Sequence, residues 1–192
     1  MRQARDSGIS TNGLMAFAGG VLVALVASRL MPPLVAQAAG TLRAQAGRDP
    51  FDALAHDHRV ILSLLDQMED SPDNATMRRT QLLLRLKRRL AAHALAEEDV
   101  VYPLLHDRAH EEEDTRRLYA EHADMKMHLF ALEQMPKDDP RWRARVGELR
   151  ALIAGHVHQE EDVDFPRLRE RLDDRATVRL SGSVQREKAL VL

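Results

Sequence analysis

A duplicated segment constrains the fold of this chain more than any other feature. The first copy begins His-Ala-Leu-Ala-Glu-Glu-Asp at His93, and the second begins His-Val-His-Gln-Glu-Glu-Asp at His156, 63 residues later. After two intervening residues, Tyr-Pro follows the first copy and Phe-Pro follows the second. One further histidine precedes each copy, His58 in the first half and His122 in the second. We therefore expect two similar halves related by pseudo-two-fold symmetry.

The spacing of apolar residues predicts that both halves are helical. In four segments, apolar side chains recur at alternating intervals of three and four residues, which is the pattern of a helix with one buried face. These segments span residues 51–68, 82–104, 118–132 and 142–163. None of them alternates with period two, and short breaks separate them, so sequential helices are expected to be antiparallel neighbours. The predicted fold is all-α, an antiparallel up-down four-helix bundle with an extra apolar N-terminal helix.

Histidine and glutamate occupy positions within the apolar stripes of the predicted helices. Residues four apart lie on one helix face, so His93 with Glu97 and His156 with Glu160 can point to one site. At a rise of about 1.5 Å per residue, all four helices deliver such residues to one layer of the bundle. Burying four imidazoles and two carboxylates is costly unless something compensates them, and a pair of divalent cations would do so. The predicted metal ligands are His58, His93, Glu97, His122, His156 and Glu160.

The ligand types narrow the choice of metal. The sequence contains no cysteine, which excludes disulfides, thiolate zinc sites, thiol nucleophiles and cysteine-held iron-sulfur clusters. Structural zinc prefers four closed ligands, whereas six converging ligands with two carboxylates suit a dinuclear, oxygen-reactive metal better. Iron is the first choice and manganese the second. The alternative is a metal-free layer in which each histidine bonds its own glutamate.

These motifs resemble those of the hemerythrin-like cation-binding domain family. The resemblance rests on two copies of His-x-x-x-Glu-Glu with Tyr-Pro or Phe-Pro after them, and on Asp57-His58 and Glu121-His122 ahead of them, and it covers about residues 51–172. It implies that the four histidines are terminal ligands of two iron ions. It also implies that Glu97 and Glu160 bridge the irons together with an oxo or hydroxo group.

One departure from the family pattern bears on function. Oxygen-carrying hemerythrins have a fifth histidine four residues after the one that corresponds to His122, and here that position is Lys126. The resemblance therefore implies an open coordination position and argues against reversible oxygen carriage. Glu98 and Glu161, next to the expected bridging residues, are interpreted as solvated, with a role beside the metal as the alternative. Tyr102 is interpreted first as a core residue and second as a redox group.

Three functions follow from this reading, and the sequence does not rank carriage, sensing and turnover. The first is a di-iron protein that binds or senses O2, NO or peroxide. The second is a di-iron enzyme that consumes peroxide or NO, or oxidises ferrous iron. The third is a structural assembly protein in which metal only holds the fold. No catalytic residue is assigned beyond the metal ligands.

The N-terminal region is apolar and then rich in proline and glycine. The expected organisation is an apolar helix at residues 1–30, a linker at 31–50, the bundle at 51–175 and a tail at 176–192. Residues 14–28 carry no charge but are few for a bilayer, which takes about 20 apolar residues. Residues 14–31 are read as a membrane anchor, a signal peptide or a helix that packs in a homo-oligomer. The favoured location is a bacterial-type membrane with the bundle in the cytoplasm, and the alternatives are soluble cytoplasmic and periplasmic protein.

The overall charge suggests little affinity for polyanions. Lysine and arginine number 28 against 30 acidic residues, which leaves a net charge of -2. A protein that binds the phosphate backbone of a nucleic acid usually carries an excess of positive charge. The sequence therefore predicts no nucleic-acid partner.

Overall fold

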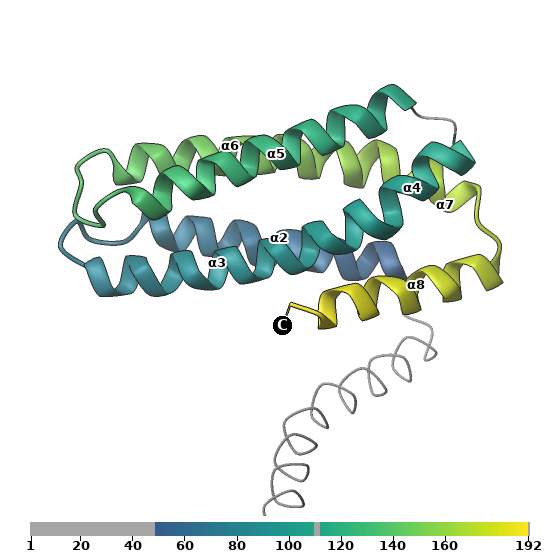
Figure 1. Cartoon of the computed structure of the whole chain (residues 1–192), viewed down its shortest axis with the longest axis horizontal. Coiled ribbons are helices and arrows are strands. Elements are labelled where there is room, and N and C mark those ends of the chain that lie inside the picture. Colours follow the sequence, from purple (N-terminus) through teal and green to yellow (C-terminus); the bar gives the residue numbers. More distant parts are fainter. Residues whose placement is uncertain (1–48, 110–111, 192) are drawn as a thin grey trace, which may run out of the picture. The chain divides into compact units, whose positions relative to one another are not determined.

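The computed structural model describes residues 49–109 and 112–191 (Figure 1). The chain divides into two compact units, Met1–Ala39 and Gly40–Leu192, and the described residues belong to the second. The expected N-terminal helix and nearly all of the expected linker lie outside the described residues. Every regular element within the described ranges is helical, which confirms the all-α prediction.

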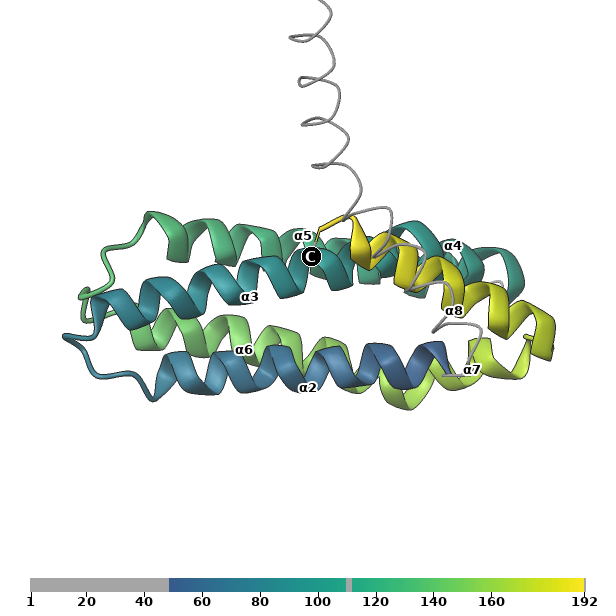
Figure 2. The same cartoon turned by 90° about the horizontal axis from the view of Figure 1, so that it is seen from below.

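Long helices of the described region form an antiparallel up-down bundle, as expected from the periodicity. They are α2 (Pro50–Glu69), α3 (Thr76–Ala96), α5 (Glu112–Gln134) and α6 (Trp142–Gln159). α2 packs against both α3 and α6, and α5 packs against α6 and α3. Short loops join α2 to α3 and α5 to α6 at one end of the bundle, as Figures 1 and 2 show.

The start of α2 illustrates how local sequence sets a helix boundary. The Asp49 carboxylate accepts a hydrogen bond from the backbone N–H of Phe51 at 2.8 Å. Pro50 occupies the first helical position, where its missing N–H leaves no intrahelical bond unmade. The cap therefore fixes the register of α2 and places His58 at its inward face.

The apolar core has two parts, and the polar layer lies between them. One cluster, near the α2–α3 and α5–α6 loops, includes Ile61 and Ile153. The other, at the opposite end, includes Leu54 and Phe165. His58 falls between members of the two clusters along α2, as the other histidine ligands do along their helices. The polar layer is thus enclosed by apolar packing on both sides.

Both copies of the duplicated segment end in a wide helical turn. α3 runs into the π-helical turn η1 (Glu97–Val101) and then α4 (Tyr102–Leu104), and α6 runs into η3 (Glu160–Asp164) and then α7 (Phe165–Glu170). Pro103 and Pro166, the second residues of α4 and α7, lack an N–H, so an α-helical bond to the fourth preceding residue is lost. The backbone N–H of Tyr102 instead donates to the carbonyl of Glu97, and that of Phe165 to Glu160.

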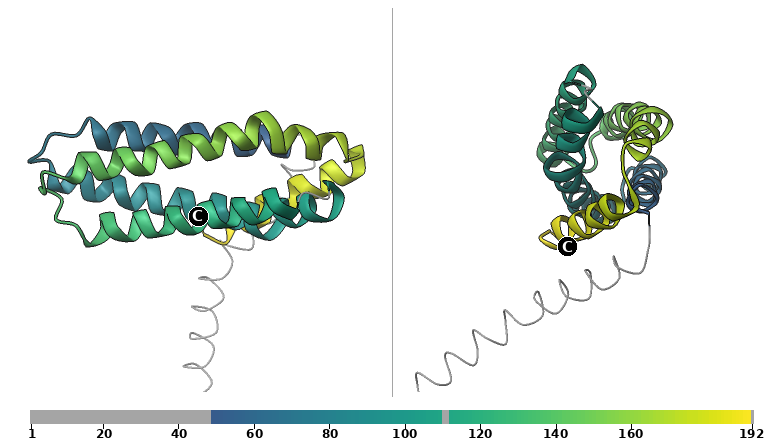
Figure 3. Two further views of the ribbon diagram at one scale, coloured as in Figure 1. Left: turned by 90° about the horizontal axis from the view of Figure 1, so that it is seen from above. Right: turned by 90° about the vertical axis from the view of Figure 1, so that its right-hand side faces the viewer.

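Two further elements complete the described region. A second π-helical turn, η2 (Leu105–Ala109), continues α4. α8 (Asp174–Ala189) lies against the outside of the bundle and packs on α3 and η1 through the buried Leu180 and Val184 (Figure 3). Most of the residues expected to form a tail therefore lie in this helix.

The expectation of a membrane-associated protein is corrected at this point. Within residues 49–109 and 112–191, no helix has both the length and the apolar character needed to cross a bilayer. The helices found there are amphipathic, because one face of each lines the bundle interior and the other meets water. The apolar run at residues 14–31, on which the expectation depended, lies outside the described residues.

Candidate metal centre

Ligand atoms from four helices and two π-turns converge in the polar layer. His93 Nε2 lies 3.1 Å from Glu97 Oε2, and His58 Nε2 lies 3.2 Å from Glu160 Oε2 and 3.7 Å from Glu97 Oε1. One atom from each of these four buried residues can be chosen such that all lie within 4.8 Å of one another. The group therefore has the size of a single cation site.

A second group adjoins the first and shares a residue with it. Glu97, His122 and His156 form a triad that meets the same distance limit. His122 Nε2 lies 3.5 Å from Glu97 Oε2, and His156 Nε2 lies 3.3 Å from Glu160 Oε2. Glu97 is common to both groups, and Glu160 contacts a histidine of each. The structure thus brings all six residues singled out from the sequence into two adjoining positions.

Many of the inward-facing atoms lack a partner among the residues that the structure describes, although His122 Nε2 and His156 Nε2 lie 3.2 Å apart, within hydrogen-bond distance. Within the described residues, His58 Nε2, His93 Nε2, both carboxylate oxygens of Glu97 and Oε2 of Glu160 are buried without a hydrogen-bond partner. Buried polar atoms are normally paired, because an unpaired one loses its hydration without compensation. Imidazole nitrogens and carboxylate oxygens are the donor set that iron and manganese take. These residues therefore fit a dinuclear metal centre.

The outer nitrogen of each histidine faces a carboxylate from a neighbouring helix or turn. The Nδ1 distances are 2.7 Å for His58 to Glu161, 3.7 Å for His93 to Asp57, 2.8 Å for His122 to Glu98 and 2.7 Å for His156 to Glu121. A proton on Nδ1 can be donated to the carboxylate, which leaves the Nε2 lone pair directed at the metal position. The imidazoles of His58, His122 and His156 are thus held in the tautomer and orientation of a ligand, whereas His93 Nδ1 is too far from Asp57 for a hydrogen bond.

This outer ring differs from the sequence-based interpretation of Glu98 and Glu161. Both were interpreted as solvated, yet their side chains are only 22% and 33% exposed and bond His122 and His58. A signal was present in the sequence, because every carboxylate of the ring is the direct neighbour of a ligand. Asp57 precedes His58 and Glu121 precedes His122 in the same way in both halves.

The Tyr102 ring packs in the apolar core, and its hydroxyl contacts residues of the metal centre. Its ring is fully buried, and its hydroxyl donates to Glu160 Oε1 at 2.9 Å and lies 2.9 Å from His122 Nε2. Burial and the nearby carboxylates of Glu97 and Glu160 hold the pKa of Tyr102 well above its usual value, so the phenol keeps its proton. Lys126 instead lies at the surface, with its Nζ 2.7 Å from Glu98.

Charges within the polar layer couple the protonation of the histidines to metal binding. Burial lowers the pKa of His58 and of His156, but hydrogen bonds and charge from Glu160 and the other carboxylates outweigh it and raise both pKa values to about 10. Burial alone would raise the pKa of Glu97, and the histidines around it hold that pKa well below its usual value. Protons and cations therefore compete for the same Nε2 atoms, and cation binding must release protons.

Comparison with known proteins assigns the family. The sequence model of the hemerythrin HHE cation binding domain matches residues 35–168. The chain belongs to this family. The match includes both copies of the duplicated segment and all six residues of the centre, and it confirms the resemblance seen in the motifs.

Two relatives of this HHE-domain chain are informative. A solved HHE cation binding domain-containing protein from Mycobacterium kansasii superposes with a TM-score of 0.63 at 23% identity, covering 72% of this chain and 83% of that one, and supports the fold. A protein of Nostoc sp. (strain PCC 7120) named DNA nickase is 30% identical over 126 residues. The match covers 66% of this chain and 35% of the nickase, so the HHE-domain chain corresponds to about a third of that relative.

The nickase overturns the prediction that nucleic acid is excluded as a partner. That prediction rested on a net charge of -2, which is a sum over the whole chain and does not describe local surfaces. In the structure, exposed arginines gather beside α8, where Arg108, Arg179 and Arg186 line one groove. A local cluster of this kind is compatible with a near-neutral total charge, although Asp99 lines the same groove and Arg186 pairs with Glu187.

Proposed function

We propose that this HHE domain is a non-haem di-iron protein that binds or senses O2, NO or peroxide. The observation that supports it most directly is the set of buried atoms of His58, His93, Glu97 and Glu160 that lack hydrogen-bond partners within the described part of the chain. Glu97 also belongs to the second group, with His122 and His156. A pair of irons would supply reversible one-electron chemistry and coordination positions for a small ligand. Manganese is the alternative metal.

The protein's own residues have distinct parts in this proposal. The four histidines present Nε2 to the metals, and the outer carboxylates fix the tautomers of three of them. Glu97 and Glu160 would be the residues shared between the two metal positions, since each contacts histidines of both groups. Tyr102 donates to Glu160 and so holds one carboxylate oxygen away from the metal positions. The apolar clusters on both sides exclude bulk water from the centre.

Metal analysis tests the site itself. Protein purified without added metal is expected to contain two irons per chain. The double variant His93→Ala, His156→Ala should lose most of this iron, because it removes one terminal ligand from each group. The matched control is His56→Ala, His158→Ala, which changes exposed histidines on α2 and α6, each two residues from a ligand. Equal iron in both double variants would refute the assigned ligands.

Ligand binding is tested on the iron-loaded chain. Rapid mixing of the reduced protein with O2 or with NO should produce a metal-ligand absorption band that the His93→Ala, His156→Ala variant lacks. Formation of no such band with O2, NO or hydrogen peroxide would contradict binding and sensing. A di-iron enzyme is the alternative, and it is distinguished by sustained consumption of peroxide or NO over many turnovers instead of one stoichiometric event.

A second candidate function, DNA strand cleavage, is favoured by the similarity to the Nostoc nickase. On this chain the surface that suits a phosphate backbone is the groove of about 430 Å³ between α8 and the η1–η2 region, which Arg108, Arg179 and Arg186 line. Because the chain spans about a third of the nickase, cleavage by this chain is a proposal of its own. Arginine side chains contribute most of such non-specific affinity through phosphate contacts.

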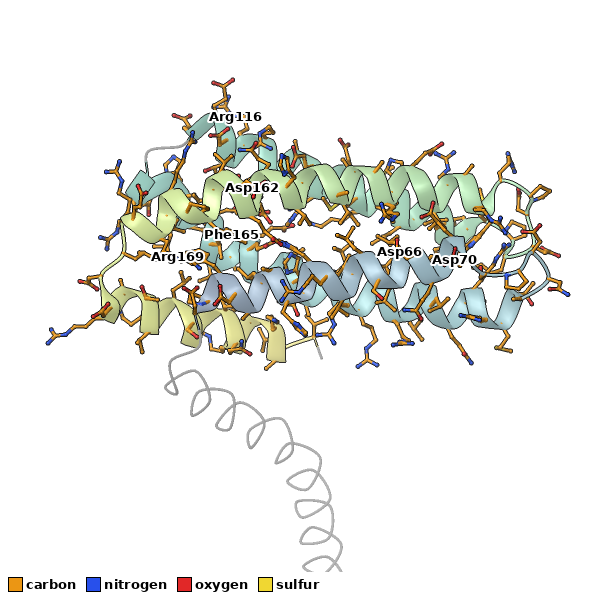
Figure 4. The ribbon with its side chains drawn as sticks, turned by 180° about the vertical axis from the view of Figure 1, so that it is seen from behind. Asp66, Asp70, Arg116, Asp162, Phe165 and Arg169 are labelled. Carbon is orange, nitrogen blue, oxygen red and sulfur yellow. The ribbon has the colours of Figure 1, made fainter. Side chains whose placement is uncertain are left out.

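Conversion of supercoiled plasmid to open circles by the iron-loaded chain tests the second function. Arg108→Ala with Arg179→Ala should weaken DNA binding and lower its salt dependence, since each lost phosphate contact reduces the slope by about one. Arg116→Ala with Arg145→Ala is the control, as both arginines are surface residues outside the groove (Arg116 is labelled in Figure 4). Equal binding by the two double variants would reject the groove as a DNA site.

A further inference from the structure

A cavity of about 250 Å³ lies between α3 and α5, and one residue of the candidate metal centre, His122, lines it. Its wall includes His122, which is 2% exposed and belongs to the second ligand group. The remaining wall is mainly apolar and consists of Leu90, Ala91, Ala94, Met125, Leu129 and Phe130. Leu90 and Met125 are buried, whereas Phe130 is 58% exposed at the mouth. The cavity therefore joins the surface to a predicted ligand by an apolar route.

Ion pairs neutralise the charged side chains at the mouth of this cavity. Lys87 Nζ lies 2.5 Å from Glu133, and Lys126 Nζ lies 2.7 Å from Glu98. Each lysine thus has its own carboxylate, and neither offers a free charge to an anion. A charged molecule would leave water for an apolar wall without gaining a partner, which is unfavourable. The cavity accordingly favours a neutral molecule with an apolar body.

The volume indicates a ligand larger than a diatomic gas. Apolar cavities of roughly 150 Å³ in proteins hold a benzene molecule. The cavity beside His122 is larger than that, and only one side of it faces the metal centre. A neutral molecule with one aromatic ring or a short alkyl body fits this space and can direct a single polar end at the metals.

We propose that the cavity binds organic hydroperoxides, with the apolar body against Leu90, Met125 and Leu129 and the peroxide end beside His122. This inference rests on the proposed di-iron function and narrows its ligand class. In the reaction, the O–O bond of the hydroperoxide breaks, and its two oxygens take up two electrons from two ferrous ions and two protons from buffer acid. The products are one alcohol, one water molecule and two ferric ions.

Filling the cavity from its edge tests the proposal. Ala91 is exposed on α3 and forms part of the wall, so Ala91→Phe places a ring in the cavity without disturbing a buried position. Leu129→Trp does the same from α5. The matched control is Ala144→Phe, an exposed alanine on α6 that is not part of the wall. All variants keep the six metal-binding residues.

Two measurements on the iron-loaded full chain decide the outcome. The first is calorimetric binding of 2-phenyl-2-propanol, the unreactive alcohol related to cumene hydroperoxide. The second compares how fast cumene hydroperoxide and hydrogen peroxide oxidise the ferrous protein. Ala91→Phe and Leu129→Trp should weaken alcohol binding and slow cumene hydroperoxide by at least about tenfold, because the added rings occupy its space. Ala144→Phe should match the unmodified chain, and hydrogen peroxide should react alike with all four proteins.

These measurements distinguish failure of the cavity proposal from failure of the proposed di-iron function. Unchanged alcohol binding in both filled variants, or equal slowing of the two peroxides, overturns the cavity proposal and leaves the di-iron function standing. Failure of both peroxides to oxidise the protein, with two irons bound, overturns the proposed function itself. Binding of the alcohol by the unmodified chain together with selective loss for cumene hydroperoxide supports the inference.

Discussion

At the scale of single residues, the metal centre is built from pairs of residues that are adjacent in sequence and whose side chains point in opposite directions. In each pair one member points to the metal position, and its neighbour holds a histidine of another helix. Glu160 and Glu161 show the arrangement, since Glu160 faces the interior and Glu161 bonds His58 Nδ1 at 2.7 Å. Two successive residues thus serve two layers of one site, which couples ligand orientation to helix packing.

Removing a carboxylate of the outer ring should weaken metal binding without removing a ligand. Glu161→Ala leaves His58 Nδ1 without its acceptor, so the ring can rotate and change tautomer. Loss of such a partner typically reduces metal affinity by about 10- to 100-fold. The control is Asp162→Ala, which changes the next residue along the chain, an exposed carboxylate paired with the exposed His158. Competition with a chelator measures both, and equal affinities would show that Glu161 has no role in orienting His58.

The Tyr102 hydroxyl should contribute stability that its ring alone does not. Tyr102→Phe keeps the buried ring but removes the donor to Glu160 Oε1, leaving that oxygen unsatisfied. The free energy of unfolding should fall by about 1–3 kcal/mol. Tyr119→Phe is the comparison, because the Tyr119 hydroxyl donates to the Glu98 carbonyl at a partly exposed position and water can replace it. Denaturant unfolding measures both variants. Equal losses in the free energy of unfolding for Tyr102→Phe and Tyr119→Phe would contradict the expectation.

Sequence reasoning reached the inner residues of the site but not its outer ring. His93 and Glu97 could be inferred because their spacing repeats in the second half and lies on one helix face. Glu98 is marked only by its adjacency to Glu97, and periodicity argues against it, since a regular helix turns about 100° per residue and directs Glu98 away from the layer. The structure replaces the regular helix there with the wide turn η1, and helix packing brings His122 to Glu98. Both effects depend on tertiary contacts that periodicity does not contain.

At the scale of elements, α8 links the end of the described chain to the metal centre. Lys188 on α8 pairs with Asp57 on α2, 131 residues earlier, and the other side of Asp57 faces His93 Nδ1 at 3.7 Å. Burial would raise the pKa of Asp57, but His93 and Lys188 lower it below its usual value. The helix thus keeps a buried carboxylate ionised beside a ligand. Its docking did not follow from the sequence, because its buried partner lies on a distant helix.

Replacing Lys188 should destabilise the fold more than replacing a surface lysine. Lys188→Met leaves Asp57, which is 2% exposed, with Arg89 at 3.6 Å and His93 Nδ1 at 3.7 Å as its remaining partners among the described residues. Breaking a buried ion pair from one side costs about 3–5 kcal/mol, and Arg89 should keep the loss near the lower end. Lys87→Met breaks the more exposed pair with Glu133 and should cost at most about 1 kcal/mol. Similar denaturation midpoints for the two variants would mean that α8 is not held through Asp57.

At the scale of the whole molecule, folding, protonation and metal binding act on the same atoms. The bundle gathers four imidazoles and two carboxylates between two apolar clusters, so their charges must be balanced within the layer. Protons on the histidines can balance the negative charge of the two carboxylates, and cations bound at Nε2 can balance it instead. The four helices and this polar layer follow from sequence periodicity, whereas the balance depends on distances that only the packed bundle sets.

The pH dependence of stability should therefore differ in direction between metal-depleted and metal-loaded protein. In the folded, metal-depleted chain the pKa of His58 and of His156 is about 10, above the value of 6.5 for a free histidine. A raised pKa means that the protonated form is favoured by folding, so this stabilisation is complete below pH 6.5 and disappears as pH rises through about 10. The melting temperature after EDTA treatment should fall over that range.

Bound metal should give stability the opposite dependence on pH. Deprotonation of the histidines at higher pH frees Nε2 for the cation, so metal binding becomes stronger. With excess Mn²⁺, the gain in melting temperature over the EDTA-treated chain should widen by more than about 5 °C between pH 6.5 and 9. The His93→Ala, His156→Ala variant provides the control, since it lacks a ligand in each group and should show little gain at any pH. Parallel pH profiles with and without Mn²⁺ would show that protons and metal do not share these histidines.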